Sequence, residues 1–312
     1  ETVLSFGTEA KKSQLTMGLY YKDTPGHMNA INDSNTGLKA RKSFTNGGSV
    51  VPMIGRIHSD MFFQNRYLLN GVDIRLKLLR NPDSLVLMAA DGSTFKLKIV
   101  NVSFFVRKVK INSGIYLKHI EKLEKQLQPA IYPLCRVNMR TFSIATGSLS
   151  YNDENLFTGI LPKRVVFGLV SSKAFEGAYN LNPFNFEHKN LKYCSLLVDG
   201  KMIPQKPLIS DFANSNSLRN YFSLLESTGQ AFNDDGIDID RSDYENGYSL
   251  ICFDLTPDLQ ENGCYHVVKK GGIRLEMRFA NALTEPINVI VYSEFDASIK
   301  IDKNRSVMTQ YY

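Results

Sequence analysis

Ile273-Arg274-Leu275-Glu276-Met277-Arg278-Phe279 alternates apolar and charged side chains without a fault. Successive side chains of a β-strand point to opposite faces, so this stretch predicts a strand with one buried face and one solvated face. Antiparallel sheets commonly provide that environment. Residues 72–78 repeat the pattern, and residues 95–99 begin in the same way. The period of two therefore predicts an all-β chain.

Apolar runs bounded by turn residues predict further strands. The runs at 164–170 and 287–292 are apolar on both faces, which indicates strands buried between two layers. Asp199-Gly200 is a strong hairpin-turn dipeptide that follows another apolar run. Additional strands are predicted at 48–57, 137–146, 193–198 and 248–255.

Apolar stripes at helical spacing predict only a few short helices. One covers residues 115–128, and the other covers residues 217–227, where Ser217 or Asn216 can cap its start and Gly229 can end it. Neither stripe needs a cofactor to explain it.

The first helix and Pro129 mark the predicted domain boundary. Residues 131–312 hold about eight strands, enough for one complete jelly roll, whereas residues 44–112 hold only about four. The first forty residues, rich in Lys, Thr, Asn and Gly, predict a long loop. We therefore expect residues 1–130 to contain that loop, the trailing part of a first, incomplete jelly roll and a linker helix, and residues 131–312 to form a second jelly roll. The earlier strands of the first barrel are expected to be missing from the chain or supplied by another segment.

Charge is unevenly distributed along a chain of net charge +6. Residues 1–130 carry 19 Lys and Arg against 10 Asp and Glu, and residues 131–312 carry 18 against 21. A basic front half can face nucleic acid, but its lysines mostly alternate with apolar residues, as on a solvated strand face. Aromatic and basic residues interleave at 61–67 and 104–108, which indicates core or subunit-interface packing or, as the alternative, a stacking platform for single strands.

Residues that carry catalytic chemistry do not form a pattern. The five histidines form no HxH or HxxxH pair, which a cupin-type metal site would need, and they are His27, His58, His119, His188 and His266. The favoured interpretation of the cysteines is buried thiols in a reducing compartment, and zinc or disulfide use is the alternative. The cysteines are Cys135, Cys194, Cys252 and Cys264. The sequence therefore predicts no catalytic, cofactor-binding or metal-binding residue, no cofactor and no enzyme.

The acidic stretch at 234–245 resembles a calcium loop at first sight. Gly236, however, lies two residues after Asp234, whereas an EF-hand places its glycine five residues on. A polar surface loop is the favoured interpretation, and a weak cation site is the alternative.

No run of about 18 uncharged apolar residues exists to span a membrane. The opening residues 1–6 lack the basic and apolar regions of a signal peptide. We expect a protein made in a reducing intracellular compartment and not secreted.

Six segments of the back half form a recognisable set. They are Ile160-Leu161-Pro162-Lys163-Arg164-Val165-Val166-Phe167-Gly168-Leu169-Val170, Ala174-Phe175-Glu176-Gly177-Ala178-Tyr179, Asn182-Pro183-Phe184-Asn185-Phe186-Glu187-His188, and residues 248–259, 273–279 and 287–307. Together they resemble one known family, the double jelly-roll major capsid proteins of animal Maverick/Polinton-like elements and adintoviruses. In the front half, residues 55–60 and 70–72 look like later strands of the first barrel. The resemblance covers about residues 45–312.

The resemblance implies a capsid subunit with two barrels side by side. Three subunits would form a homotrimer with a pseudo-hexagonal outline that tiles an icosahedral shell, so the expected location is the virion. Its partners would be neighbouring capsomers, minor or penton capsid proteins and, without sequence specificity, encapsidated DNA. The loops at 17–48, 175–186 and 205–215 are candidates for the lateral contacts. In this family the first barrel begins upstream of Glu1, which agrees with the half-barrel counted here.

Two other functions fit a jelly roll. A lectin-like or receptor-binding module would carry a shallow polar pocket with aromatic platforms. A domesticated capsid homologue would keep the fold without forming particles.

Overall fold

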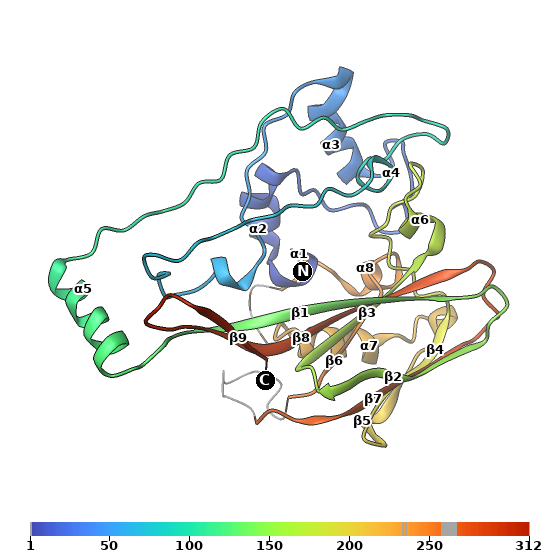
Figure 1. Ribbon diagram of the computed structural model, residues 1–312. Coiled ribbons are helices and arrows are strands. Elements are labelled where there is room, and N and C mark those ends of the chain that lie inside the picture. The colour runs from blue at the N-terminus through green and yellow to red at the C-terminus, as the bar shows by residue number, and fades with distance from the viewer. Residues whose placement is uncertain (1, 233, 235, 257–266, 312) are drawn as a thin grey trace. The chain divides into compact units, whose positions relative to one another are not determined.

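The computed structural model describes residues 2–232, 234, 236–256 and 267–311 (Figure 1). Within them the strands form two antiparallel sheets and the helices are short, which confirms the prediction of a β-sheet fold with short helices. The strands are β1 (Ala130–Ile144), β2 (Ser150–Ile160), β3 (Arg164–Ser171), β4 (Leu191–Val198), β5 (Lys201–Ile209), β6 (Leu250–Asp254), β7 (Lys270–Phe279), β8 (Ile287–Ile301) and β9 (Val307–Tyr311).

The strand order is that of a jelly roll. One sheet runs β1-β8-β3-β6 and the other β2-β7-β4-β5, and β9 pairs with β8 outside this path. Consecutive strands β1 and β2, and again β2 and β3, lie in different sheets, as in the two Greek keys of an eight-stranded jelly roll. The eight strands from β1 to β8 therefore make one jelly roll.

Strand β7 confirms the alternating pattern. Ile273, Leu275 and Met277 are all fully buried, whereas Arg278 is exposed and pairs with Glu276. The strand lies between β2 and β4, and its apolar face therefore points into the space between the two sheets.

The other strand predictions in the second half are largely confirmed. All residues from 165 to 170 of β3 are buried, and Phe167 meets Phe253 of β6 edge to face with ring centroids 5.9 Å apart. Asp199 and Gly200 both have positive φ, 48° and 79°, as a tight two-residue hairpin turn between β4 and β5 requires.

Both predicted helices are present. Residues 113–125 form α5 (Ser113–Ile120) and η4 (Glu121–Lys125), and α7 (Leu218–Ser227) packs against β6. The cap prediction for Ser217 is wrong in detail, because its hydroxyl donates to Glu245 Oε1 at 2.6 Å and makes no cap bond. The remaining helices are α1 (Thr2–Ser5), α2 (Thr8–Lys12), η1 (Gln14–Gly18), α3 (Thr36–Thr45), η2 (Asn46–Gly48), η3 (Asp60–Phe62), α4 (Asp83–Val86), α6 (Ser172–Glu176), η5 (Phe212–Asn214) and α8 (Arg241–Glu245).

The front half differs from the sequence expectation. The predicted strands at 48–57, 72–78 and 95–99 are not formed in the structure. A strand is stable only when neighbouring strands satisfy its backbone hydrogen bonds, and an alternating pattern alone does not supply them. The predicted N-terminal loop is wrong at both ends, where residues 2–18 contain α1, α2 and η1 and residues 36–45 form α3, whereas residues 19–35 form no helix or strand. The division into two barrels, at 1–130 and 131–312, stays a prediction.

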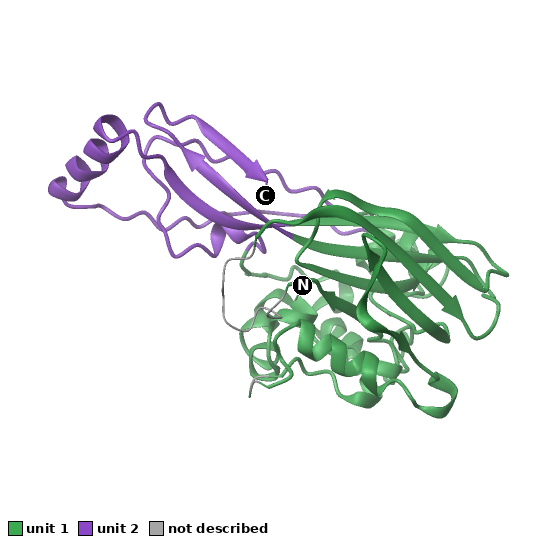
Figure 2. Cartoon of the chain, turned by 90° about the horizontal axis from the view of Figure 1, so that it is seen from below, with its two compact units in different colours: residues 1–56, 81–95, 137–294 green, residues 57–80, 96–136, 295–312 purple. Residues whose placement is uncertain are grey.

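The chain divides into two compact units (Figure 2). Unit 1 consists of residues 1–56, 81–95 and 137–294, and unit 2 consists of residues 57–80, 96–136 and 295–312. In unit 2, β9 pairs with the end of β8 from Ala297 to Ile301. The guanidinium of Arg136 lies 4.7 Å from the ring centres of both Phe295 and Tyr311, so cation–π contacts hold β9 in place.

Candidate functional site

The N-terminal arm, residues 2–45, packs on loops of the jelly roll within unit 1. Asn182 is buried and forms three hydrogen bonds with the arm: its backbone N–H donates to Asn29 Oδ1 at 2.8 Å, and its Nδ2 donates to Asp23 Oδ2 at 2.9 Å and to the Met28 carbonyl at 3.3 Å. Asp23 also pairs with Arg41 of α3. This buried polar network fixes the arm to the loop that follows α6.

The acidic stretch is used by the same arm. Lys22 Nζ donates to Asp243 Oδ2 at 2.6 Å and lies 3.8 Å from Asp238 Oδ1. Asp240 and Asp243 form the capping box of α8. These carboxylates therefore serve a helix cap and an ion pair, which favours the surface-loop interpretation over the cation site; Asp235 lies outside the described residues.

Lys11 is a buried cation of the arm. Its Nζ donates to the carbonyls of Val3, at 2.8 Å, and Ile237. Burial lowers the pKa of Lys11 to about 8, although the nearby Asp238 acts in the opposite direction. The ammonium is therefore harder to keep charged in the folded state than in the unfolded chain.

We expect the free energy of unfolding to rise with pH between about 8 and 10 because of Lys11. Below pH 8 both states hold the proton, and burial of the ammonium destabilises the fold. Above pH 8 the folded state releases the proton first, so this destabilisation is relieved. Urea denaturation at several pH values should show the rise in the native protein and in the exposed control Lys12→Met, but not in Lys11→Met. An equal rise in all three would contradict the assignment.

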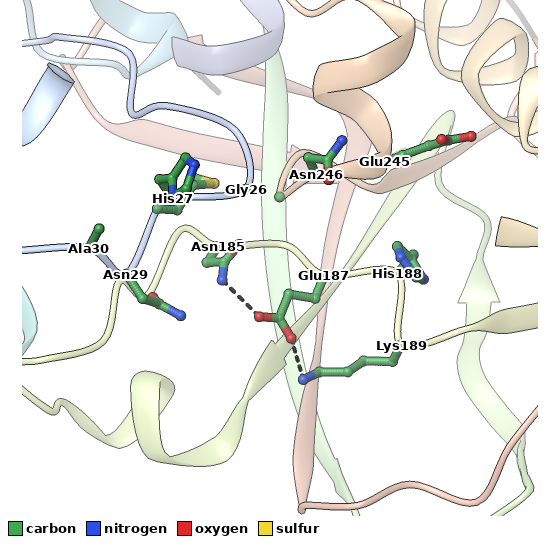
Figure 3. A pocket seen from close by; sticks show the side chains of 12 residues that line it. Gly26, His27, Asn29, Ala30, Asn185, Glu187, His188, Lys189, Glu245 and Asn246 are labelled. Atoms are coloured by element: carbon green, nitrogen blue, oxygen red, sulfur yellow. Dashed lines mark hydrogen bonds and ion pairs between the residues drawn. The ribbon is translucent and has the colours of Figure 1, made fainter. Parts of the chain in front are cut away.

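A cavity of about 460 Å³ opens beside the arm (Figure 3). Three segments line it: residues 26–30 of the arm, Asn185 with residues 187–189 of the loop before β4, and residues 245–247 at the end of α8. The Asn185 amide donates to Glu187 Oε1 at 2.9 Å, and Lys189 pairs with Glu187 and, at 2.6 Å, with Glu285. The charged groups on this wall of the cavity thus bind one another.

The titration behaviour of this wall follows from the same contacts. Burial alone would lower the pKa of Lys189, but its hydrogen bonds to Glu187 and Glu285 outweigh burial and raise that pKa. The Lys189 hydrogen bond in turn lowers the pKa of Glu285. Burial lowers the pKa of His188, whose ring stacks on Phe212 with centroids 4.1 Å apart. His188 therefore favours the neutral form, and Lys189 remains a cation.

The structure brings two of the five histidines of the chain to this cavity. His27 and His188 both line it, from opposite sides in Figure 3. His58 and His119 belong to unit 2, and His266 lies outside the described residues. The described residues contain no group of three or more His, Cys, Asp or Glu side chains that could hold a metal ion. The sequence could not predict this cavity, because the three segments that line it are far apart along the chain.

The described cysteines are thiols rather than disulfides. Cys194 and Cys252 are buried, and Cys135 is partly buried; Cys264 lies outside the described residues. Burial raises the pKa of Cys252 to about 12 and raises that of Cys194 as well. Both therefore stay protonated at neutral pH and are poor nucleophiles.

Unit 2 presents a second candidate surface. Its segment from 60 to 69 lies along the beginning of β1: Gln64 Nε2 donates to the Pro133 carbonyl at 2.6 Å, and Tyr132 Oη donates to the Tyr67 carbonyl at 3.0 Å. Beyond it, residues 72–80 and 96–110, here called the alternating segments, expose large apolar side chains. These are Ile74, Leu76, Leu78, Leu79, Ile99, Val100, Val102, Phe104, Phe105, Val106 and Val109.

The sequence-predicted aromatic and basic clusters belong to this surface. Phe62 and Phe104 meet edge to face with ring centroids 5.9 Å apart, whereas Phe105 is 81% exposed. Large exposed apolar surfaces are typical of interaction sites, which makes these segments a candidate interaction surface. The surface thus has strand-like sequence without strand partners in the described chain.

Comparisons with known proteins give one curated relative. An uncharacterized protein of Caenorhabditis elegans is 27% identical over 98% of this chain and 72% of its own length. No family model matches the chain. In the described residues no helix has both the length and the apolar character needed to cross a membrane.

Solved structures of viral capsids are similar to part of the chain. The Sputnik virophage structure covers 59% of this chain at 14% identity with a TM-score of 0.39. The PBCV-1 virus capsid covers 60% at 11% identity with a TM-score of 0.35, and the mavirus major capsid protein covers 59% at 11% identity with a TM-score of 0.34. This chain spans 39%, 53% and 42% of the length of those three chains, respectively.

Proposed function

We propose that this chain is a structural subunit of a viral or virus-like capsid. The observation that carries the proposal is the jelly-roll strand order of β1 to β8. The alternating segments support it, because strand-patterned sequence with exposed apolar residues is what an unfinished neighbouring barrel would show. A shell subunit needs extended self-complementary surfaces rather than a catalytic cleft.

The finer assignment rests on the sequence resemblance to major capsid proteins of Maverick/Polinton-like elements and adintoviruses. In this proposal a first barrel is completed by strands that pair with the alternating segments, and three subunits form a pseudo-hexagonal homotrimer. Trimers contact neighbouring capsomers and minor or penton proteins in an icosahedral shell of a virion, which also encloses DNA. The role is structural rather than enzymatic.

The proposed contact loops give a direct test of assembly. Phe184 lies in the loop at 175–186 and is 64% exposed. If that loop forms the trimer interface, Phe184→Asp places a charge in an apolar contact and should shift sedimentation velocity from trimer to monomer, with a dissociation constant raised at least about 10-fold.

Phe232→Asp is the matched control. Phe232 is 79% exposed and lies outside the three predicted contact loops, so this variant should sediment like the native protein. A native chain that stays monomeric at all concentrations tested would contradict the trimer, and equal behaviour of both variants would contradict the role of this loop.

The cavity beside the arm favours one alternative, a lectin-like or receptor-binding module. Asn, Glu and Lys side chains line it, and His188 of the lining stacks on Phe212. Binding of a monomeric chain to a glycan array, lost in His188→Ala, would support that module over the capsid subunit. A domesticated capsid homologue would give trimers that never close into shells.

A further inference from the structure

The charge of the molecule is separated between its two units. Unit 2 carries 16 Lys and Arg against 6 Asp and Glu, while unit 1 carries 21 against 25. The excess of positive charge thus lies in the smaller unit, which includes the alternating segments. The charge difference between units 2 and 1 is larger than that between residues 1–130 and 131–312. One reason is that the basic residues of 295–312 belong to unit 2.

The positive charge of unit 2 is on its surface. Among its described residues, 13 Lys and Arg are exposed against three exposed acids, Asp73, Glu121 and Glu124. Two other acids are used inside the unit: Asp60 Oδ2 accepts from the Cys135 backbone N–H at 2.6 Å, and Asp302 Oδ1 accepts from Ser306 at 2.8 Å. The surface of this unit is therefore strongly cationic.

The alternating segments determine which partner fits. Where Ile74 and Leu76 face the interior of a completed barrel, the opposite strand face carries Arg75 and Lys77. The same alternation places Lys96 and Lys98 together on one face. Barrel completion removes the apolar side chains from the surface, which argues against a membrane as the partner, and leaves the cations.

We propose that unit 2 binds the phosphate backbone of nucleic acid through these cations. The inference rests on the proposed function, since the cationic face is left outward by completion of the barrel. Exposed aromatic side chains stand among the basic residues: Tyr67 follows Arg66, and Phe105 lies two residues before Arg107. Such neighbours let bases of a single strand stack while the cations bind phosphates.

Salt-dependent binding of 30-nucleotide single-stranded DNA and of a 30-base-pair duplex tests the proposal. With about four phosphates neutralised, raising salt from 50 to 200 mM should weaken duplex binding by roughly 100-fold. The variant Lys96→Glu/Lys98→Glu/Arg107→Glu/Lys108→Glu should lose at least about 10-fold in affinity for both DNAs at 50 mM salt. Tighter binding of the single strand would assign the exposed aromatics a stacking role.

A matched variant carries the same charge change in unit 1, at exposed lysines: Lys173→Glu/Lys192→Glu/Lys201→Glu/Lys206→Glu. Because it keeps every cation of unit 2, it should bind DNA within about twofold of the native chain although its net charge falls as far as in the unit 2 variant. Equal losses in both variants, or no salt-dependent binding by the native chain, would overturn the proposal. Binding only to phosphatidylserine vesicles would overturn it in favour of a membrane.

The salt dependence is measured on the native chain, so the test remains valid even if a variant fails to fold.

DNA binding and assembly are separate measurements. Trimers without DNA binding would overturn this inference alone, whereas DNA binding by a chain that never assembles would overturn the proposed function.

Discussion

Replacing Leu275 with alanine is expected to lower the free energy of unfolding by about 2–5 kcal/mol. Leu275 is fully buried in β7, opposite Leu196 of β4 and Asp153 of β2. Its removal leaves a cavity between the two sheets of the jelly roll, and packed strands on both sides limit the collapse that could fill it. Urea denaturation followed by circular dichroism measures the change.

Leu218→Ala is the matched control for this prediction. Leu218 is 52% exposed at the start of α7, so the same truncation there should cost less than about 1 kcal/mol. Equal losses for the two variants would show that β7 does not lie in the core of the sandwich.

Gly37→Ala is expected to detach the N-terminal arm and to lower stability by about 1–3 kcal/mol. Gly37 lies inside α3, where alanine would ordinarily stabilise a helix. Here an added Cβ would lie 2.7 Å from the carbonyl carbon of Lys22 and 2.9 Å from the backbone nitrogen of Asp23, and closer still to the Lys22 oxygen. These are backbone atoms, which cannot rotate away, so α3 must move from the segment that carries Asp23.

Hydrogen exchange of residues 2–45 measures the detachment, since displacement of α3 also breaks the pair between Arg41 and Asp23. Gly55→Ala is the control, because no atom lies within 4 Å of its added Cβ. Faster exchange of the arm in Gly37→Ala and not in Gly55→Ala is the expected result. Unchanged exchange in both variants would contradict the close packing of α3.

The jelly-roll half could be predicted because its information is local. In residues 273–279 the alternation predicts which side chains are buried and which are exposed, and Asp199-Gly200 predicts the hairpin turn. Residues 72–78 carry an equally regular pattern but form no strand in the structure. Whether they form a strand depends on partner strands elsewhere. A periodic pattern predicts which side chains share a face, but it does not predict which strands pair.

The arm and the cavity could not be predicted for the same reason. Asn182 bonds to residues more than 150 positions away, and Lys11 reaches Ile237. The composition of the first forty residues indicated a loop, although Asn35 accepts from Leu38 N–H and caps α3. An Asn at this position is a local signal that could have predicted the start of α3.

Negative-stain electron microscopy of the full-length expressed protein tests the capsid assignment most directly. The account predicts particles with a three-fold, near-hexagonal outline that associate into closed shells. Monodisperse monomers at every concentration and ionic condition tested would contradict it.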